Sequence, residues 1–496
     1  MTGAGDEAFQ RARRGARAAR WGLATAALGV SLGLALGGCA SPAAPPSPGP
    51  AAPSAEGPIT AAAIERLHAE PCPPEQASAF GGVDPSGILC GTLTVPLDHA
   101  DPDGATLELE VAIREGDRPS GLLLLLGGGP GGTSRWTTAV LPLLMPQVAD
   151  EYQFVALDHR GTGADALDCP SLQAEIGQSD LLPPSPATLE ECAALLGERA
   201  AHQATADTVA DLELLREALG AEGWVLDGMS YGTFVEARYA MAHPDAIRGL
   251  VLDSPVDPRG VDPFARSSMA EVPRVLGELC AAQHCGFDPV AALERVLASG
   301  YPALDLLDLL VTTSVTDAGY TGILDALEAA AAGDTAALDE RVAGAQAAAR
   351  GEALAAFSAG AHVATLCADT PMPWGGADTD PAERRAALDA AVAAIDPAET
   401  HPFPPSLGAE LGPIAACLNW PATRYAPPLT GDFPDLPALI LAGGVDLSTP
   451  IADLDAVLEV IPGAVEVVIP DAGHAAQMRP DGAAAVSEFL LTLGDR

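Results

Sequence analysis

Short runs of apolar residues recur along the chain and predict buried strands. The clearest of these runs cover residues 122–126, 152–157, 224–226, 250–252, 438–441 and 465–469. Stretches of helical composition separate them, for example residues 206–219 and 451–460. Continuous apolar strands that alternate with helices are typical of a parallel sheet covered on both faces. The pattern therefore predicts an α/β fold with a mostly parallel sheet and a closing helix over residues 482–493.

The strand pattern disappears between residues 253 and 436 and is replaced by Ala- and Leu-rich helical stretches. An independent helical domain is one interpretation of this segment. The return of sheet-like strands after it favours an insertion into the sheet domain instead. We expect a large helical cap at residues 259–432, inserted between a first core part at 61–258 and a C-terminal core part at 433–496.

The chain begins with an Arg-rich stretch, followed by an apolar stretch over residues 21–36 that is short for a membrane span. This order predicts a signal peptide over residues 1–38. Residues 36–39 resemble a bacterial lipobox, so we expect Cys39 to be lipidated and to attach the protein to a membrane. An unmodified cysteine beside an ordinary cleavage site is the alternative. Residues 39–60 are rich in Pro and Ala and predict an extended tether.

The overall charge excludes one class of partner. The chain has 25 basic and 67 acidic residues, for a net charge of −42, and it contains no lysine. Nucleic acid is therefore not expected as a partner. An acidic field that attracts a cationic substrate is one interpretation, and a uniformly solvated acidic surface is the plainer one.

Eight cysteines remain after Cys39, and an even number in an exported chain predicts disulfides. Eight cysteines allow 105 connectivities. Short-range pairing favours Cys72–Cys90, Cys169–Cys192 and Cys280–Cys285, which leaves Cys367–Cys417. Cys280, His284 and Cys285 could instead ligate a metal, but no second ligand pair lies nearby in the sequence. We therefore expect no metal site.

Ser230 stands at the centre of a Gly-X-Ser-X-Gly pentapeptide that ends an apolar run. A serine on a tight turn from strand to helix exposes its hydroxyl above the sheet, and such a turn requires small residues on both sides. Gly228 and Gly232 meet this requirement, and residues 234–243 have helical composition. In a chain with 52 glycines, the pentapeptide alone fits an ordinary turn equally well.

A serine nucleophile needs a base and an orienting acid, and one recurrent chain order is Ser, Asp, His. Asp446 follows the strand that ends at residue 441, and His474 follows the next strand. Both therefore lie where a parallel sheet presents its binding edge. Asp253 also ends a strand and is a competing candidate for the acid.

The glycine-rich segment at residues 127–132 directly follows the first apolar strand. A phosphate-binding loop is one interpretation, but the Lys-Ser/Thr ending of a P-loop is missing. A backbone N–H of this loop, together with the N–H of Tyr231, could stabilise a developing oxyanion. We therefore interpret the segment as part of an oxyanion hole.

Five motifs follow one another along the chain: Gly-Gly-Gly-Pro-Gly-Gly at 127–132, Asp-His-Arg-Gly-Thr-Gly at 158–163, Gly-Met-Ser-Tyr-Gly at 228–232, Asp446 with Leu-Ser-Thr-Pro, and Gly473-His474. Three further segments accompany them: Cys-Gly-Thr-Leu-Thr-Val-Pro-Leu-Asp-His at 90–99, Cys-Ala-Asp at 367–369 and Cys-Leu-Asn-Trp-Pro at 417–421. Together these motifs resemble the prolyl and tripeptidyl aminopeptidase group of serine hydrolases, and most of all its secreted TAP-like branch. The resemblance covers roughly residues 72–494. Ala475 departs from it, because a glycine is common at that position.

The resemblance implies an α/β-hydrolase fold whose cap precedes the strand that carries the acid. It implies Ser230 as nucleophile, His474 as general base and Asp446 as orienting acid. It also implies Gly129 and Tyr231 as oxyanion donors, and an acidic cap residue that binds the ammonium of a free peptide N-terminus.

We therefore expect an exported serine hydrolase, at the cell surface or secreted, that needs no cofactor. Its expected activity is that of an aminopeptidase that releases short peptides (di- or tripeptides) or a residue from free N-termini through an acyl-enzyme on Ser230. A carboxylesterase would use the same three residues on a small ester. A non-catalytic surface lipoprotein is a third hypothesis, which the intact order of the three residues disfavours.

Overall fold

The computed structural model describes residues 59–116, 120–376, 379–421 and 431–494. The predicted signal peptide, Cys39 and nearly all of the predicted tether lie outside these residues.

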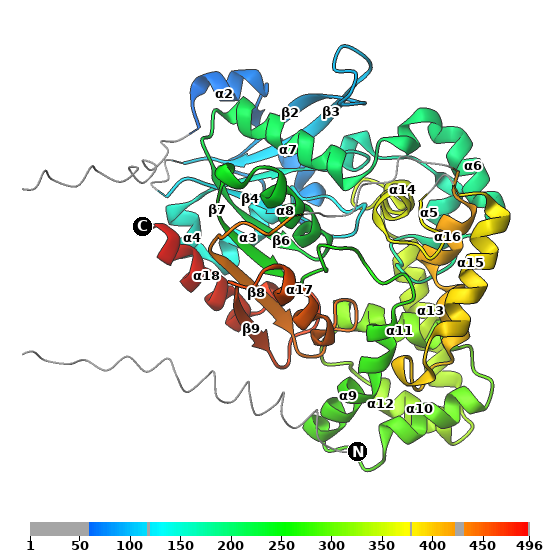
Figure 1. Ribbon diagram of the computed structural model, residues 1–496. Helices are drawn as coiled ribbons and strands as arrows, with labels where there is room; N and C mark the ends of the chain where they lie inside the picture. The colour runs from blue at the N-terminus through cyan, green and yellow to red at the C-terminus, as the bar shows by residue number, and fades with distance from the viewer. Residues whose placement is uncertain (1–58, 117–119, 377–378, 422–430, 495–496) are drawn as a thin grey trace, which may run out of the picture. The chain divides into compact units, whose positions relative to one another are not determined.

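A single nine-stranded sheet organises the described chain, in the order β1-β2-β3-β5-β4-β6-β7-β8-β9 (Figure 1). The strands are β1 Glu70–Pro71, β2 Ile88–Pro96, β3 Thr106–Arg114, β4 Leu122–Leu126, β5 Gln153–Leu157, β6 Trp224–Met229, β7 Ile247–Asp253, β8 Ala438–Gly443 and β9 Val465–Ile469. The first three pairs in this order, β1–β2, β2–β3 and β3–β5, are antiparallel. The other five pairs, β5–β4, β4–β6, β6–β7, β7–β8 and β8–β9, are parallel. The predicted mostly parallel sheet is confirmed.

Strand β4 shows why the central strands are apolar throughout. Its five leucines are all at most 4% exposed, because helices cover both faces of the sheet. Leu124 packs in one core with helices α7, α8 and α17, whereas Leu123 and Leu125 pack in another with α3, α4 and α18. Burial of each leucine contributes about 1.5–3 kcal/mol.

Most helices on these two faces come from the chain segments that connect parallel strands, whereas α2 precedes β1 and α18 follows β9. On the first face lie α2 Ala61–Arg66, α7 Thr205–Leu219, α8 Tyr231–Ala242 and α17 Leu454–Val460, and on the second α3 Thr137–Leu144, α4 Pro146–Glu151 and α18 Pro480–Gly494. Short 3₁₀ helices cover Pro74–Phe80, Gly163–Asp165, Gly197–Ala201, Pro244–Ala246, Pro397–Glu399, Pro405–Glu410, Ile451–Asp453 and Ala476–Met478.

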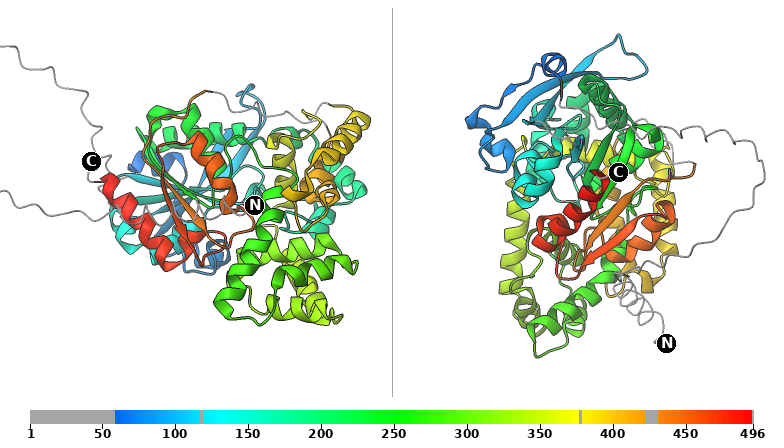
Figure 2. Two further views of the ribbon diagram at one scale, coloured as in Figure 1. Left: turned by 60° about the horizontal axis from the view of Figure 1, so that its bottom comes forward. Right: turned by 90° about the vertical axis from the view of Figure 1, so that its left-hand side faces the viewer.

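Between β7 and β8 the described chain forms helices and adds no strand to the sheet. They are α9 Arg266–Gln283, α10 Pro289–Ala298, α11 Ala303–Thr316, α12 Ile323–Ala331, α13 Ala336–Arg350, α14 Ala359–Asp369, α15 Pro381–Ala394 and α16 Gly412–Asn419. We call this segment the helical insertion. Figure 2 shows its light green to yellow helices together on one side of the sheet.

The helical insertion has two apolar cores of its own. Helices α9 to α13 share one of them. Helices α14 and α16 share the other with α5 Pro170–Ile176 and α6 Pro186–Leu196, which precede β6 in the chain. The helical layer is therefore assembled from two separate parts of the sequence.

Four disulfides join the eight described cysteines: Cys72–Cys90, Cys169–Cys192, Cys280–Cys285 and Cys367–Cys417. These are the pairs expected from the sequence, and the Cys280–Cys285 bond replaces the alternative of a metal site. Disulfides are typical of proteins that fold outside the cytosol, which supports an extracellular location. Within the described ranges, no helix combines the length and the apolar character that a membrane span requires.

Removing the Cys367–Cys417 disulfide should destabilise the fold more than removing Cys280–Cys285. Their sequence separations are 50 and 5 residues, and a longer closed loop restricts the unfolded chain more. Chain-entropy arguments give a loss of about 4 kcal/mol for the Cys→Ser pair at 367 and 417, and about 2 kcal/mol for the pair at 280 and 285. Denaturant unfolding of the two double variants measures both losses. Equal losses would contradict the loop-length argument.

Candidate active site

Ser230 lies on a sharp turn between β6 and α8, with φ 55° and ψ −123°. A side chain at Gly228 would bring its Cβ within 2.7 Å of the backbone of Gly232. A side chain at Gly232 would bring its Cβ within 2.4 Å of the carbonyl oxygen of Leu126. Both distances are too short for any real contact, so only glycine fits on either side of the serine. The strained serine and its two glycines are the features of a nucleophile elbow.

Asp446 and His474 form a hydrogen-bonded pair on the loops that follow β8 and β9. His474 Nδ1 lies 2.8 Å from Asp446 Oδ2, and the Asp446 side chain is fully buried. The backbone N–H groups of Ser448 and Thr449 and the Thr449 hydroxyl also donate to this carboxylate. Because a carboxylate accepts, Nδ1 of His474 carries the proton, which leaves Nε2 available as a base.

The electrostatics of the pair suit this division of roles. Burial of Asp446 raises its pKa, but the charge of His474 and the hydrogen bonds from His474 and Thr449 outweigh burial, so the net shift is downward. Burial lowers the pKa of His474, but the charge and hydrogen bond of Asp446 outweigh burial and raise the pKa above 6.5. The pair therefore favours an ionised aspartate beside a histidine with increased basicity.

Asp253, the competing candidate for the acid, does not hydrogen-bond the His474 ring within the described structure. Its carboxylate instead accepts from the backbone N–H groups of Ala476 and Gln477, at 2.9 and 3.0 Å. Burial raises the pKa of Asp253 to about 7. Of the two candidate acids, Asp446 is the partner of His474, and Asp253 holds the loop that follows the histidine.

Ala475, at which the sequence departs from the motif it otherwise resembles, adopts the left-handed conformation with φ 60°. Its N–H donates to Ser254 Oγ at 2.8 Å. The backbone therefore keeps the turn that glycine would favour, and the position of His474 does not depend on the glycine.

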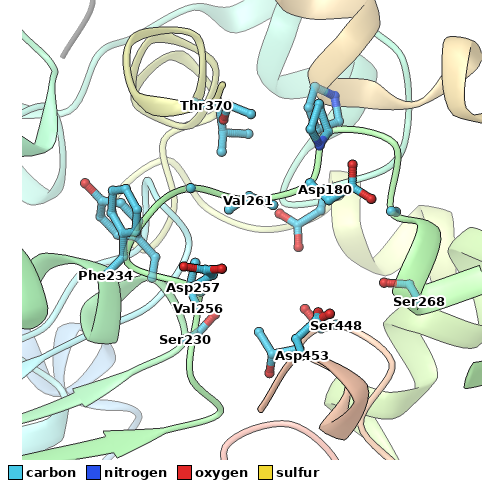
Figure 3. A pocket seen from close by; sticks show the side chains of 18 of the residues that line it. Asp180, Ser230, Phe234, Val256, Asp257, Val261, Ser268, Thr370, Ser448 and Asp453 are labelled. Carbon is cyan, nitrogen blue, oxygen red and sulfur yellow. The ribbon is translucent and has the colours of Figure 1, made fainter. Parts of the chain in front are cut away.

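A cleft brings the elbow together with the glycine-rich loop and the loop that carries Asp446, whereas His474 is not among the residues that line it. Ser230, Tyr231 and Gly129 line it, as do Ser448 and Thr449 from the loop of Asp446. Figure 3 shows Ser230 and Ser448 among the side chains of this lining. The Ser230 hydroxyl has no hydrogen-bond partner among the described residues. Serine to histidine contacts are often loose without substrate and tighten when it binds.

The two predicted oxyanion donors are free. Among the described residues, neither the N–H of Gly129 nor that of Tyr231 has an acceptor, although both residues line the cleft beside Ser230. Gly128 runs so close to the elbow that a Cβ on it would lie 2.9 Å from the Cβ of Ser230. The glycine-rich loop can therefore place an N–H near the serine, as an oxyanion hole requires.

The sequence did not point out most of the acidic residues that line the cleft. Five aspartates line it: Asp180, Asp257, Asp262, Asp369 and Asp453. No Arg or His belongs to the described lining. These aspartates come from separate loops and helices, and only Asp369 belongs to a motif noted in the sequence.

Two of the five aspartates are neutralised by ion pairs and three are not. Asp257 pairs with Arg259 at 2.8 Å, and Asp262 with Arg266 at 2.9 Å. The other three, Asp180, Asp369 and Asp453, have no arginine ion pair in the described structure, and burial raises the pKa of each. A cationic group in the cleft would relieve the cost of ionising them.

Comparison with known proteins supports the fold. A family model described as the alpha/beta hydrolase fold matches residues 121–286. The chain has the α/β-hydrolase fold. It is 27% identical to tripeptidyl aminopeptidase of Streptomyces lividans over 409 residues, and the match covers 74% of each chain. It is also 34% identical over 200 residues to serine protease Hip1 of Mycobacterium tuberculosis, which covers 36% of this chain and 38% of that one.

Solved structures similar to this α/β-hydrolase include a thermophilic esterase from Thermogutta terrifontis. The two are 17% identical with a TM-score of 0.36, and the match covers 81% of this chain and 99% of the esterase. The relatives and the nucleophile elbow together identify the α/β-hydrolase as a serine hydrolase.

The activity of this α/β-hydrolase should rise with pH through an apparent pKa above 6.5. A general base works in its neutral form, and Asp446 raises the pKa of His474. Asp446→Asn removes that charge, so the acid limb of the profile of kcat/KM should move to lower pH. The rate should also fall about 10³–10⁴-fold. The pH dependence of nitrophenyl ester hydrolysis measures both effects.

Asp471→Asn is the matched control, because Asp471 is an exposed acid on the same loop as His474. It should leave the acid limb where it is. An acid limb that stays in place in Asp446→Asn would contradict the assignment of the pair.

Proposed function

We propose that this α/β-hydrolase is an exported aminopeptidase that releases short peptides, of two or three residues, from free N-termini. The acidic cleft around Ser230 is the observation that carries the proposal. The match to tripeptidyl aminopeptidase over 74% of the chain supports it independently.

The reaction begins when Ser230 Oγ attacks the scissile carbonyl and His474 Nε2 accepts the hydroxyl proton. Asp446 stabilises the imidazolium that forms, since it accepts the hydrogen bond from Nδ1 at 2.8 Å. The N–H groups of Gly129 and Tyr231 donate to the oxyanion, and one such donor lowers the barrier by about 3 kcal/mol. His474 then protonates the leaving amine. In the second half of the reaction His474 accepts a proton from water, the water attacks the acyl-enzyme carbonyl, and His474 gives the proton to Ser230 Oγ as the peptide acid leaves.

The free N-terminus of the substrate is recognised by charge. Its ammonium would enter a cleft with five aspartates in its lining and no described cation. Asp180 and Asp453 have no arginine ion pair in the described structure, so they are the best candidates to bind it. The helical insertion also supplies residues to the lining of this cleft, among them Val311, Thr365 and Leu411.

Peptides with a free N-terminus should be cleaved at least 100-fold faster, in kcat/KM, than the same peptides with an acetylated N-terminus. The acetyl group removes the positive charge that the aspartates bind, so a carboxylate in the cleft loses its partner. Tripeptidyl and dipeptidyl anilides with and without the acetyl group measure this ratio. Ser230→Ala is the control and should reduce every rate to background.

The other outcomes separate the competing functions. Equal rates on free and acetylated peptides would refute the recognition of the N-terminus. Turnover of short nitrophenyl esters alone would identify a carboxylesterase. No turnover of any substrate that depends on Ser230 would favour a binding protein.

We also propose that export proceeds through a signal peptide over residues 1–38, with lipid on Cys39. The basic and apolar order of the first residues and the Leu-Gly-Gly-Cys sequence at 36–39 support this. Mass spectrometry of the mature N-terminus should show a lipid-modified Cys39, and Cys39→Ser should release the protein from the membrane fraction. A mature chain that starts elsewhere, or with an unmodified Cys39, would refute the anchor.

A further inference from the structure

The glycine-rich loop beside Ser230 is held by the helical insertion as well as by the sheet. Thr133 donates its N–H to the Ala356 carbonyl at 3.2 Å, and Ser358 donates to the Gly131 carbonyl at 2.9 Å. Gly132 and Phe357 form an isolated antiparallel bridge. The segment just before α14 therefore runs along the loop like an added strand.

His362, in α14, adds a side-chain contact to the same loop. Its Nδ1 lies 2.9 Å from the carbonyl oxygen of Pro130, and the residue is 3% exposed. Because a carbonyl only accepts, Nδ1 carries the proton and donates it. Pro130 directly follows Gly129, which lines the cleft with Ser230 and whose N–H has no acceptor among the described residues. The bond thus acts one residue away from the oxyanion donor.

The histidine has little freedom to move. A Cβ on Gly131 would lie 3.2 Å from the Cβ of His362 and 2.6 Å from the carbonyl oxygen of Ser358, so the loop and α14 are in close contact. The ring of Phe357 lies 5.5 Å from the imidazole, between ring centroids. On its other side, His362 Nε2 lies 3.6 Å from Asp180 Oδ1, and Asp180 lines the cleft. A carboxylate, an imidazole and a loop carbonyl therefore follow one another across the cleft wall.

We propose that His362 is a positioning residue for the oxyanion hole: its Nδ1–H fixes the Pro130 carbonyl and thereby aims the Gly129 N–H at the substrate oxygen. The proposal rests on acyl transfer at Ser230 as proposed above. It predicts that His362 affects the chemical step more than substrate binding. It also makes the helical insertion a part of the catalytic machinery, because α14 supplies the residue that sets the loop.

The size of the effect follows from the value of one oxyanion donor. Loss of such a donor lowers kcat by about 10²–10³-fold. Removing the hydrogen bond of His362 leaves Gly129 in place but less well aimed, so we expect a smaller loss in kcat, about 10- to 100-fold, with KM changed by less than about threefold.

The test compares His362→Leu with His362→Asn in the full-length protein. Leucine fills the space without a donor, whereas the asparagine amide can place an N–H where Nδ1 stood. The substrate is a short uncharged nitrophenyl ester, which does not need the acidic residues of the cleft. We expect a 10- to 100-fold lower kcat for His362→Leu, and a kcat within about threefold of wild type for His362→Asn. The rate of fluorophosphonate labelling at Ser230 should follow the same order.

His401→Leu is the matched control, because it removes a 59% exposed histidine of the same insertion that pairs with Glu294. It should keep the wild-type kcat. Thermal unfolding of all variants separates loss of stability from loss of positioning.

Three results would overturn the inference. A wild-type kcat in His362→Leu would show that the bond does not matter. Equal loss of kcat and of thermal stability in both variants at position 362 would show a packing role alone. Absence of Ser230-dependent ester turnover and labelling in the wild type would remove the proposed function, and with it the inference.

Discussion

The close approach of backbones around Ser230 is the constraint on which the rest of the site depends. Gly232 passes so near the Leu126 carbonyl that a Cβ would lie 2.4 Å from it. This contact ties the end of β4, where the glycine-rich loop begins, to the start of α8, where the elbow ends. One backbone contact therefore fixes the proposed nucleophile relative to the glycine-rich loop, and the contact is possible because Gly232 has no side chain.

The parallel order of the sheet brings the proposed acid and base to the same edge as the proposed nucleophile. Strands β6, β7, β8 and β9 are neighbours in that order, and Ser230, Asp253, Asp446 and His474 follow their carboxyl ends. Two buried acids lie near one histidine at this edge, and hydrogen bonding separates their roles. Asp446 accepts from the imidazole, whereas Asp253 accepts from the backbone beyond it. The same residue type thus serves as an ionised partner in one place and as a backbone anchor in the other.

The helical insertion contributes to the site in two ways. It supplies part of the cleft wall, and its segment before α14 pairs with the glycine-rich loop. Helices α5 and α6 share a core with α14 and α16, and the Cys367–Cys417 disulfide joins the latter two. The helix that carries His362 is therefore braced by residues distant from it in the sequence, which suits a side chain whose position matters.

The sequence by itself determined the strands, the elbow and the order Ser230, Asp446, His474, because apolar runs, glycines and strand ends are local signals. It also determined the cysteine pairs, three of which are close in the chain. Only the tertiary structure decided between Asp446 and Asp253, since both end strands and only the packing shows which carboxylate meets the imidazole. The acidic lining of the cleft and the contact from His362 to Pro130 were likewise decided there. Pro130 and His362 are 232 residues apart in the chain, and no local pattern of charge or hydrophobicity records a contact across that separation.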